Sequence, residues 1–378
     1  MLTRRNRILI AAAVTLIALF FGLNPRDFRF NNAARWIGTS NGIRFGKFGI
    51  AYSPEGFSLP STGASDPSAF TVEIAVKPYR TQAGNFQFIA SWHAGDDAGQ
   101  LVIGQWRSSI IVMNGDDYDN HRRLPKIYAK NAVPEGKATF LTISTGQNGT
   151  RLFVDGGLAA TKRGLFLRMP RGGSGATLTL GNSVYGRNSW EGEWLGLAAF
   201  NRNLDSGEIE DHFRRWHAEG DFGFAKNHPD LAALYRLNDK AGHQARDSGP
   251  ASNHLAIPDK MKILEKRFLT APDRGLRITK TVVADLLINL LGFIPIGVAY
   301  AMFFSRRAVF DTRAALWAVA FGALLSLTIE LAQAWVPSRN SSLLDLVLNT
   351  IGAVSGAMLY RRFAKYRQLI RKKGGNDA

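Results

Sequence analysis

Two stretches decide the fold of this chain: DLLINLLGFIPIG at residues 285–297 and SLTIELAQAWVPSRNSSLLDLVLNTIGAVSG at residues 326–356. With their flanks they form three apolar runs, which cover residues 284–304, 314–336 and 343–360. Each run has about the 17 to 25 residues that an α-helix needs to cross the roughly 30 Å hydrocarbon layer of a bilayer. The sequence therefore predicts three transmembrane helices in this region.

Each apolar run carries two polar residues, which are expensive to place inside a membrane. They are Asp285 and Asn289 in the first run, Glu330 and Gln333 in the second, and Asp345 and Asn349 in the third. Their spacing puts each pair on one helix face, and small residues continue these faces, namely Gly292, Gly322, Ser326, Gly352 and Gly356. Because small residues let helices approach closely, we expect the helices to pack along these faces, with the six polar side chains turned toward one another as a binding pocket.

These residues resemble the VanZ-like membrane proteins, whose recurring pattern is N-x-x-x-F-x-P-x-G, S-x-x-x-E-x-x-Q, a P-x-R loop and D-x-x-x-N-x-x-G. The matching positions are Asn289, Phe293, Pro295 and Gly297; Ser326, Glu330 and Gln333; Pro337 and Arg339; and Asp345, Asn349 and Gly352. The resemblance covers about the last quarter of the chain. It implies an all-α transmembrane four-helix bundle, and a link to glycopeptide antibiotic resistance, from which the family takes its name.

A further apolar run at residues 8–23 follows three arginines, so it could be a cleaved signal peptide or a retained membrane anchor. No small-x-small cleavage site follows it, and the VanZ-like pattern normally has a helix upstream, so we expect a retained first span. With the N-terminus in the cytoplasm, four crossings place residues 24–282 outside a bacterial cytoplasmic membrane. The polar pairs then lie near the outer ends of their helices, with Arg339 on the short loop above them as the seventh pocket residue.

The net charge of +17 would ordinarily suggest a nucleic acid partner, but the distribution of the charge argues against one. Thirteen basic residues flank the apolar runs: Arg4, Arg5, Arg7, Arg306, Arg307, Arg313, Arg361, Arg362, Lys365, Arg367, Arg371, Lys372 and Lys373. A preference for positive charge on the cytoplasmic side explains most of this basicity. Residues 259–282 are also basic, and either lie on anionic lipid headgroups or form a solvated linker. Cysteine is absent, which excludes disulfides and thiolate metal sites.

Residues 29–258 consist of short alternating segments separated by turn signals, a pattern typical of an antiparallel all-β sandwich. FTVEIAVKP at residues 70–78, LFVDGG at 152–157 and WEGEWLGLAAFNRNLDSGEIE at 190–210 resemble the laminin-G or concanavalin A-like jelly roll. The resemblance implies a lectin-like domain inserted after the first helix. The segment at residues 231–257 resembles the opening of such domains, although it follows the closing helix, and could be a permuted edge strand.

Lectin-like sandwiches bind sugars by stacking aromatic side chains on the sugar rings and by hydrogen bonds from loops. The glycan-binding candidates are Trp92, Trp106, Tyr118, Tyr185 and Trp190. For the three tryptophans the alternative is a place in the sandwich core. Related folds include glycosidases with an E-x-D-x-x-E ladder. That ladder does not occur in this sequence, and for Glu191 and Glu193 a solvated edge is favoured over catalysis.

Laminin-G-like domains often hold calcium with carboxylates and carbonyls. The loop GDDYDN at residues 115–120 offers oxygen ligands from Asp116, Asp117, Asp119 and Asn120. Acidic turns are also common without a metal. Calcium is therefore an alternative that the sequence leaves open, and no other cofactor is indicated.

The predicted domains are a basic N-terminus with the first helix (1–28), the β-sandwich (29–258), a basic linker (259–282), three VanZ-like helices (283–361) and a basic cytoplasmic tail (362–378). The favoured function is a non-enzymatic envelope receptor, in which the sandwich captures a glycan and the pocket holds part of a cell-wall or lipid-linked precursor. The alternative is a membrane-embedded enzyme or transporter that uses Glu330 as base or proton carrier and Asp345 as its partner. A third hypothesis is that the polar residues satisfy one another without a ligand. Serine nucleophile, H-E-x-x-H and phosphate-loop motifs are missing, which favours the receptor.

Overall fold

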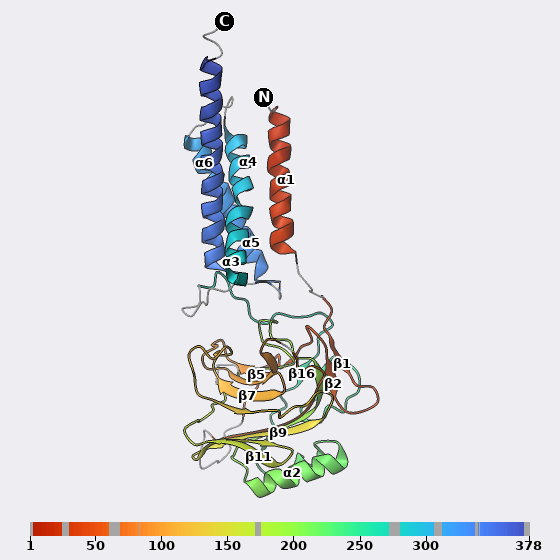
Figure 1. The fold of residues 1–378 in the computed structure, drawn as a ribbon. Coiled ribbons are helices and arrows are strands. Elements are labelled where there is room, and N and C mark those ends of the chain that lie inside the picture. Colours follow the sequence, from red (N-terminus) through yellow and green to blue (C-terminus); the bar gives the residue numbers. More distant parts are fainter. Residues whose placement is uncertain are drawn as a thin grey trace. The chain divides into compact units, whose positions relative to one another are not determined.

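The structure is a computed structural model of the 378-residue chain. It describes residues 3–24, 30–59, 69–82, 84–170, 175–271, 280–305, 312–336, 339 and 341–373. The chain divides into two compact units (Figure 1): a helical unit of Met1–Phe28 with Lys266–Ala378, and a β unit of Arg29–Glu265. The first helix thus groups with the last ones, although more than 230 residues of β structure separate them in the sequence.

The helical unit contains α1 (Arg4–Leu23), α3 (Lys280–Gly292), α4 (Ile294–Phe304), α5 (Thr312–Gln333) and α6 (Leu343–Lys373). Among the described residues, four segments are long and apolar enough to cross a membrane: Arg4–Leu23, Val282–Phe304, Thr312–Gln333 and Leu343–Ile370. These segments correspond to the four apolar runs of the sequence. The prediction of an apolar helical region beside an all-β domain is confirmed.

One predicted helix is divided. Residues 284–304 fall in one candidate span, Val282–Phe304, as expected, but its helix is interrupted: α3 ends at Gly292 and α4 begins at Ile294. The reason is Pro295, which has no backbone N–H and whose ring excludes the carbonyl of the residue four positions earlier. The helix therefore restarts at Phe293, whose φ of −94° and ψ of −6° join the two pieces.

Small residues bring α6 into backbone contact with α3 and α4. A Cβ atom added to Gly356 would lie 2.1 Å from the carbonyl oxygen of Ile294, and one added to Gly352 would lie 2.3 Å from that of Leu290. Both distances are far below van der Waals contact, so only glycine fits at these crossings. The expected stripe of small residues is thus used in packing, with the exception of Gly292, whose added Cβ would meet nothing within 4 Å.

The first helix is docked on this bundle. The Thr15 hydroxyl lies 2.9 Å from the hydroxyl of Tyr300 on α4, and the Arg7 guanidinium donates to the carbonyl of Ser305 at 2.8 Å. The N-terminal end of α1 therefore lies beside the C-terminal end of α4, and the two helices run antiparallel. Ala11 is buried in the apolar cluster that α1 shares with α4, α5 and α6.

The β unit is an antiparallel sandwich of two sheets. The first sheet has the order β1 (Ala34–Trp36), β2 (Ile43–Phe45), β13 (Gly192–Phe200), β4 (Phe70–Pro78), β9 (Thr139–Gly146), β10 (Gly149–Val154) and β11 (Gly157–Lys162), and β14 (Leu231–Tyr235) also pairs with β13. The second has the order β15 (Gln244–Ala245), β16 (Leu255–Ala256), β3 (Ala51–Tyr52), β12 (Thr177–Leu180), β5 (Gln87–His93), β6 (Leu101–Trp106), β7 (Ser109–Asn114) and β8 (Lys126–Ala129).

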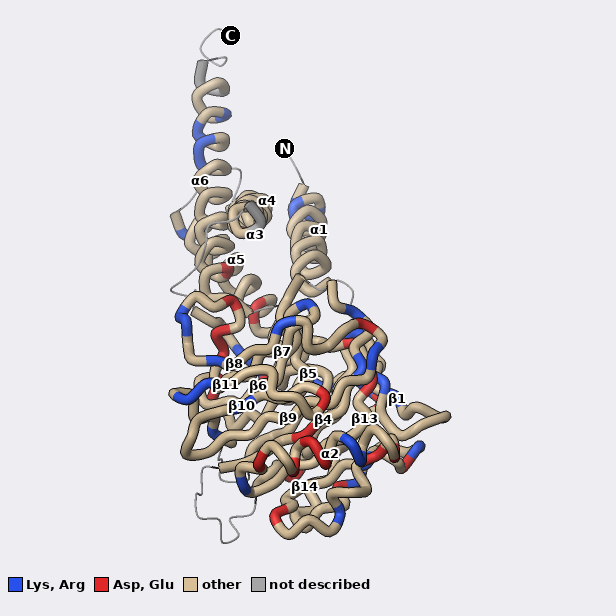
Figure 2. Tube along the Cα trace, turned by 60° about the horizontal axis from the view of Figure 1, so that its bottom comes forward, with Lys and Arg blue, Asp and Glu red and all other residues tan. Residues whose placement is uncertain are grey.

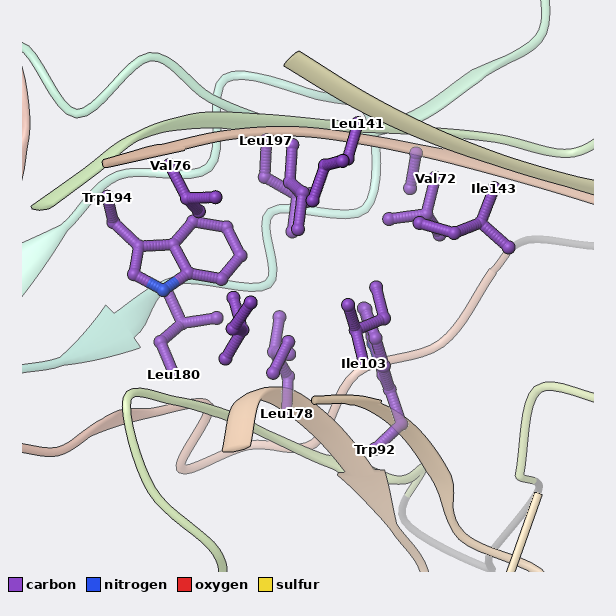
Figure 3. Packing of buried hydrophobic residues seen from close by; sticks show 14 of the residues in the cluster. Val72, Val76, Trp92, Ile103, Leu141, Ile143, Leu178, Leu180, Trp194 and Leu197 are labelled. Atoms are coloured by element: carbon purple, nitrogen blue, oxygen red, sulfur yellow. The ribbon is translucent and has the colours of Figure 1, made fainter. Parts of the chain in front are cut away.

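The core lies between the sheets because side chains alternate along each strand. Figure 3 shows two layers that face each other. Val72, Val76, Leu141, Ile143, Trp194 and Leu197 come from the first sheet, and Trp92, Ile103, Leu178 and Leu180 come from the second. All are buried. The segment at residues 231–257 supplies β14 to the first sheet and β15 and β16 to the edge of the second.

One helix, α2 (Ser206–Glu219), packs on the outer face of the first sheet (Figure 1), followed by the short helix η1 (Gly223–Ala225). Asp205 caps α2 by accepting from the Glu208 N–H, while the Glu208 side chain accepts from the Asp205 N–H. Beneath α2 the carboxylate of Glu73 is fully buried and lies 3.0 Å from the imidazole of His212. Burial raises the pKa of Glu73, and its position under the helix makes this pair a part of the scaffold.

Candidate functional site

The polar residues of the helical unit meet where α5 ends and α6 begins. Glu330 is 2% exposed, and its carboxylate accepts a hydrogen bond of 2.7 Å from the backbone N–H of Ser342. The Ser342 hydroxyl in turn accepts from the N–H of Asp345, in the first turn of α6. Glu330 therefore holds the loop that positions Asp345, and the two carboxyl groups are close enough to interact electrostatically.

The other two polar pairs join the same cluster. The side chains of Asn289 and Asp285 on α3 lie near the Asp345 carboxyl. One turn further along α6, the amide of Asn349 donates to the Ser326 hydroxyl on α5 at 2.9 Å. The structure thus brings together five of the seven predicted pocket residues: Asp285, Asn289, Glu330, Asp345 and Asn349.

Gln333 and Arg339 form hydrogen bonds with the end of α1, which the sequence did not predict. The Gln333 amide donates to the carbonyl of Gly22 at 2.8 Å, and the Arg339 guanidinium donates to the carbonyls of Phe21 and Asn24 at 2.9 and 3.3 Å. The last carbonyls of a helix have no partner within the helix, so these two side chains complete the C-terminal end of α1. Arg339 also lies within electrostatic range of Glu330. Pro337 of the motif lies outside the described residues.

One further contact near this cluster has no signal in the sequence. Thr270, which precedes the helices, donates from its hydroxyl to the Ser341 carbonyl at 2.8 Å and accepts from the Leu343 N–H at 3.1 Å. These bonds tie Thr270 to residues 341–343, at the start of α6. A single threonine in a basic segment has no recognisable spacing, so periodicity could not have identified it.

In the β unit, two of the five glycan-binding candidates belong to the core. Trp92 and Trp190 are both 0% exposed, and the Trp190 indole donates to the Gln105 side chain at 2.6 Å. A fully buried ring offers no face to a sugar, so Trp92 and Trp190 are core residues and not part of a glycan site. Their selection from residue type was misleading, because tryptophans that fill a sandwich and tryptophans that bind sugars occur in equally apolar strands.

The two tyrosine candidates are half-buried and hydrogen-bonded. Tyr118 stacks on Phe86 with ring centres 5.2 Å apart, and its hydroxyl accepts from the Gln100 amide at 2.6 Å. The Tyr185 hydroxyl donates to the Asp97 carboxylate at 3.0 Å. Burial raises the pKa of Tyr118 and of Tyr185, so both phenols stay neutral and keep a proton to donate.

Trp106, the fifth candidate, is 38% exposed on β6. Tyr128 on β8, which was not among the candidates, is 54% exposed. The register places Gly104 opposite Ile111, and Ile111 opposite Tyr128, so these side chains and that of Trp106 share the outer face of the second sheet. The strand context KIYA, in which Tyr128 alternates with buried neighbours, was the signal that could have revealed it.

The acidic loop at residues 115–120 is held by the protein itself. The buried Asp117 accepts from the N–H groups of Arg122 and Leu124 at 2.8 and 2.9 Å and from the Lys126 ammonium at 3.0 Å. Although burial alone opposes ionisation, these donors hold the pKa of Asp117 below its usual range. Asp116 pairs with Arg122, and Asp119 pairs with His121 at 2.9 Å.

This geometry does not fit a calcium site. Calcium needs about six to eight oxygen ligands, but the three carboxylates of this loop already pair with His121, Arg122 and Lys126. Across the described ranges, no group of three or more His, Asp and Glu side chains is placed to hold a metal ion. The loop is therefore explained as a structural turn closed by Asp117.

The VanZ/LLP1 family model matches residues 234–365, which include the end of β14, β15 and β16 as well as the last helices. The model of the concanavalin A-like lectin/glucanases superfamily matches residues 54–210. No curated protein sequence matches the chain.

Several solved structures resemble the chain distantly. A putative carbohydrate binding protein from Bacteroides ovatus is 11% identical, with a TM-score of 0.40, over 62% of this chain and 62% of that protein. The CBM40 of a Ruminococcus gnavus sialidase, bound to sialyllactose, is 15% identical, with a TM-score of 0.34, over 47% of this chain and 95% of its own. Domain 4 of a Geobacillus stearothermophilus arabinanase is 16% identical, with a TM-score of 0.31, over 47% and 75%.

Likenesses this distant say nothing about the ligand of this chain. The two family matches cover the two regions whose motifs suggested these families: the polar positions of the last helices and the strand motifs of the sandwich. The chain therefore combines a VanZ-like C-terminal region of apolar helices with a concanavalin A-like domain that precedes it.

Proposed function

We propose that this protein is a multi-pass receptor of a bacterial cytoplasmic membrane that holds its sandwich outside the cytoplasm and binds a glycan there. The observation that carries the glycan site is the exposed aromatic pair, Trp106 and Tyr128, on the outer face of the second sheet. Sugars bind through contact of their C–H faces with aromatic rings. The match to a lectin and glucanase superfamily supports the same ligand class.

The spacing of the pair suits an oligosaccharide. β6 and β8 flank β7, so two strand spacings, about 10 Å, separate them. Ser109 and Ile111 of β7 lie between the two rings, and the Phe86 ring covers Gly104 beside them. We expect a chain of several sugar units to lie across the strands with a ring at each end.

Removal of either ring is expected to weaken glycan binding at least tenfold, a loss of about 1.4 kcal/mol. The full-length protein in neutral-lipid nanodiscs would first be screened on an array of bacterial wall glycans, and Trp106→Ala and Tyr128→Ala then compared on the best ligand. Phe166→Ala is the matched control, because Phe166 is also an exposed aromatic of the sandwich, 53% exposed. Equal losses in all three variants, or none in the first two, would refute the aromatic site.

For the helical unit we propose that the polar cluster near the start of α6 binds the headgroup or peptide of a wall precursor or lipid-linked precursor at the outer side of the membrane. Support comes from the concentration of acceptors there: Asp285, Glu330 and Asp345 with Asn289 and Asn349. Buried polar residues in a membrane are costly and are usually retained for function. The exposure of these residues to the outer side rests on the arginine distribution.

A second function is supported by one observation, the link of Glu330 and Asp345 through Ser342. Two such groups in a site of low dielectric can share one proton. This arrangement would suit a proton carrier or a general base acting on a lipid-linked substrate. The same carboxylate also holds the start of α6 through its bond with Ser342. Variants of Glu330 must therefore be tested for folding as well as for function.

A further inference from the structure

A row of charged side chains crosses four strands of the first sheet. The register places Arg35 of β1 opposite Arg44 of β2. It also places Glu193 of β13 between Arg44 and Lys77 of β4. Residues that lie directly opposite in antiparallel strands point to the same side of the sheet, and the neighbours of these residues along the strands lie in the core. The charged row therefore faces outward.

This row lies on the open part of the outer face. The other part of that face is covered by α2, which packs on an apolar cluster that includes Phe140 and Phe200. The side chains of Arg44 and Arg80, by contrast, are 57% and 67% exposed. Figure 2, in which basic residues are blue and acidic residues red, shows the tube around β1, β13 and β4. A ligand in solution can reach these side chains without any movement of the fold.

Cations outnumber carboxylates in this patch. Glu193 accepts from Arg44 at 3.2 Å, lies 3.6 Å from the Lys77 ammonium and accepts from the Tyr79 hydroxyl. Although burial opposes its ionisation, the Tyr79 hydroxyl, Lys77 and Arg44 hold the pKa of Glu193 below its usual range, so it is an anion at neutral pH.

The second carboxylate of the patch is Glu191, which lies 3.5 Å from Arg80. The four cations Arg35, Arg44, Lys77 and Arg80 therefore face two carboxylates, Glu191 and Glu193. The patch keeps an excess of positive charge.

Arg35 and Arg44 form a like-charge pair directly opposite each other on neighbouring strands. The Arg44 guanidinium donates to Glu193 at 3.2 Å, which compensates its charge. The Arg35 guanidinium donates to the carbonyl of its neighbour Ala34 at 2.8 Å, a contact that does not neutralise its charge. An anion beside these guanidinium groups would accept charge-assisted, bidentate hydrogen bonds.

We infer that this row, which we name the arginine row (Arg35, Arg44, Lys77 and Arg80), binds a polyanionic glycan that carries phosphodiester or uronate groups. The row spans three strand spacings, about 15 Å, which is enough for successive charges of a polymer. Guanidinium groups match the planar or tetrahedral oxygens of either anion. The site lies on the sheet opposite to the Trp106 and Tyr128 pair, so it does not depend on the proposed aromatic site.

The test is a titration of the full-length protein in phosphatidylcholine nanodiscs at low salt with poly(glycerol phosphate), with polygalacturonate and with neutral dextran. We expect binding of at least one polyanion but not of dextran, and loss of most of that binding at about 0.5 M salt, where screening is strong. The polymer that binds identifies the anion as phosphodiester or carboxylate. Failure of both polyanions to bind would overturn the inference.

Variants then locate the site. Arg35→Gln with Arg44→Gln is expected to weaken polyanion binding about tenfold, whereas Lys226→Gln with Lys240→Gln, which removes the same charge from exposed positions elsewhere, should change it less than twofold. Glu191→Gln should strengthen binding, because it releases Arg80. Arg35→Gln alone should keep or raise the melting temperature, since it removes the like-charge pair. Equal effects of the two double variants would show nonspecific attraction and contradict the arginine row.

Discussion

Gly356→Leu is expected to prevent the helical unit from assembling. Even the Cβ of an alanine would lie 2.1 Å from the Ile294 carbonyl oxygen and 2.8 Å from the Val298 nitrogen, both of them backbone atoms that cannot turn aside. α6 would therefore have to separate from α4, with loss of the close packing on which helix association in membranes depends. Overpacking of a well-packed core typically costs about 1–3 kcal/mol, and a backbone clash costs more.

The matched control is Gly292→Leu, because a Cβ at Gly292 would meet nothing within 4 Å. Both variants add the same apolar side chain to a helix. Detergent gel filtration and thermal unfolding should give a wild-type profile for Gly292→Leu, and an aggregated or strongly destabilised protein for Gly356→Leu. Similar melting temperatures for the two variants would show that α4 and α6 do not cross at Gly356.

Glu330→Ala is expected to destabilise the helical unit, whereas Glu330→Gln should leave it folded. Glu330 is 2% exposed and accepts the N–H of Ser342, so alanine leaves that buried donor without its acceptor. A buried donor without a partner costs about 1–3 kcal/mol. The glutamine side chain keeps the shape and one oxygen that can accept the same bond.

Function then separates the remaining hypotheses for this residue. If the carboxylate binds a ligand or carries a proton, Glu330→Gln should reach the membrane in normal amount and melt normally, yet lose whatever protection the wild type gives host cells against a glycopeptide antibiotic. If the cluster is packing alone, Glu330→Gln should behave like the wild type in both assays. Membrane abundance and detergent melting temperature are the controls that make either result interpretable.

The sequence predicted those parts of the fold and of the site that depend on local, periodic patterns of residues. The apolar runs, and the polar residues spaced three or four apart within them, predicted helices that bring Glu330, Asp345 and Asn349 into one cluster. The spacing of small residues likewise predicted the close approach at Gly352 and Gly356. Alternation along short segments predicted the sandwich, because a strand with one buried face must repeat every two residues.

The sequence did not predict contacts between side chains and partners that lie far away along the chain. Arg339 was expected above the carboxylates, and the bonds from its guanidinium to carbonyls of α1, more than 300 residues earlier in the chain, were not expected. No local pattern encodes these bonds. The burial of Trp92 and Trp190 and the exposure of Tyr128 have the same origin, since the side of a sheet that meets the core depends on how the two sheets stack.

The central claim is that the sandwich lies outside the cytoplasm while the end of α6 lies inside, and site-directed labelling tests it most directly. The chain has no cysteine, so a single introduced thiol has no background. Lys130→Cys places one on an exposed position after β8, and Arg367→Cys places one on an exposed position of α6. In spheroplasts treated with a membrane-impermeant maleimide, residue 130 should be labelled at once and residue 367 only after the membrane is permeabilised. Labelling of residue 367 but not residue 130 in intact spheroplasts would contradict the account.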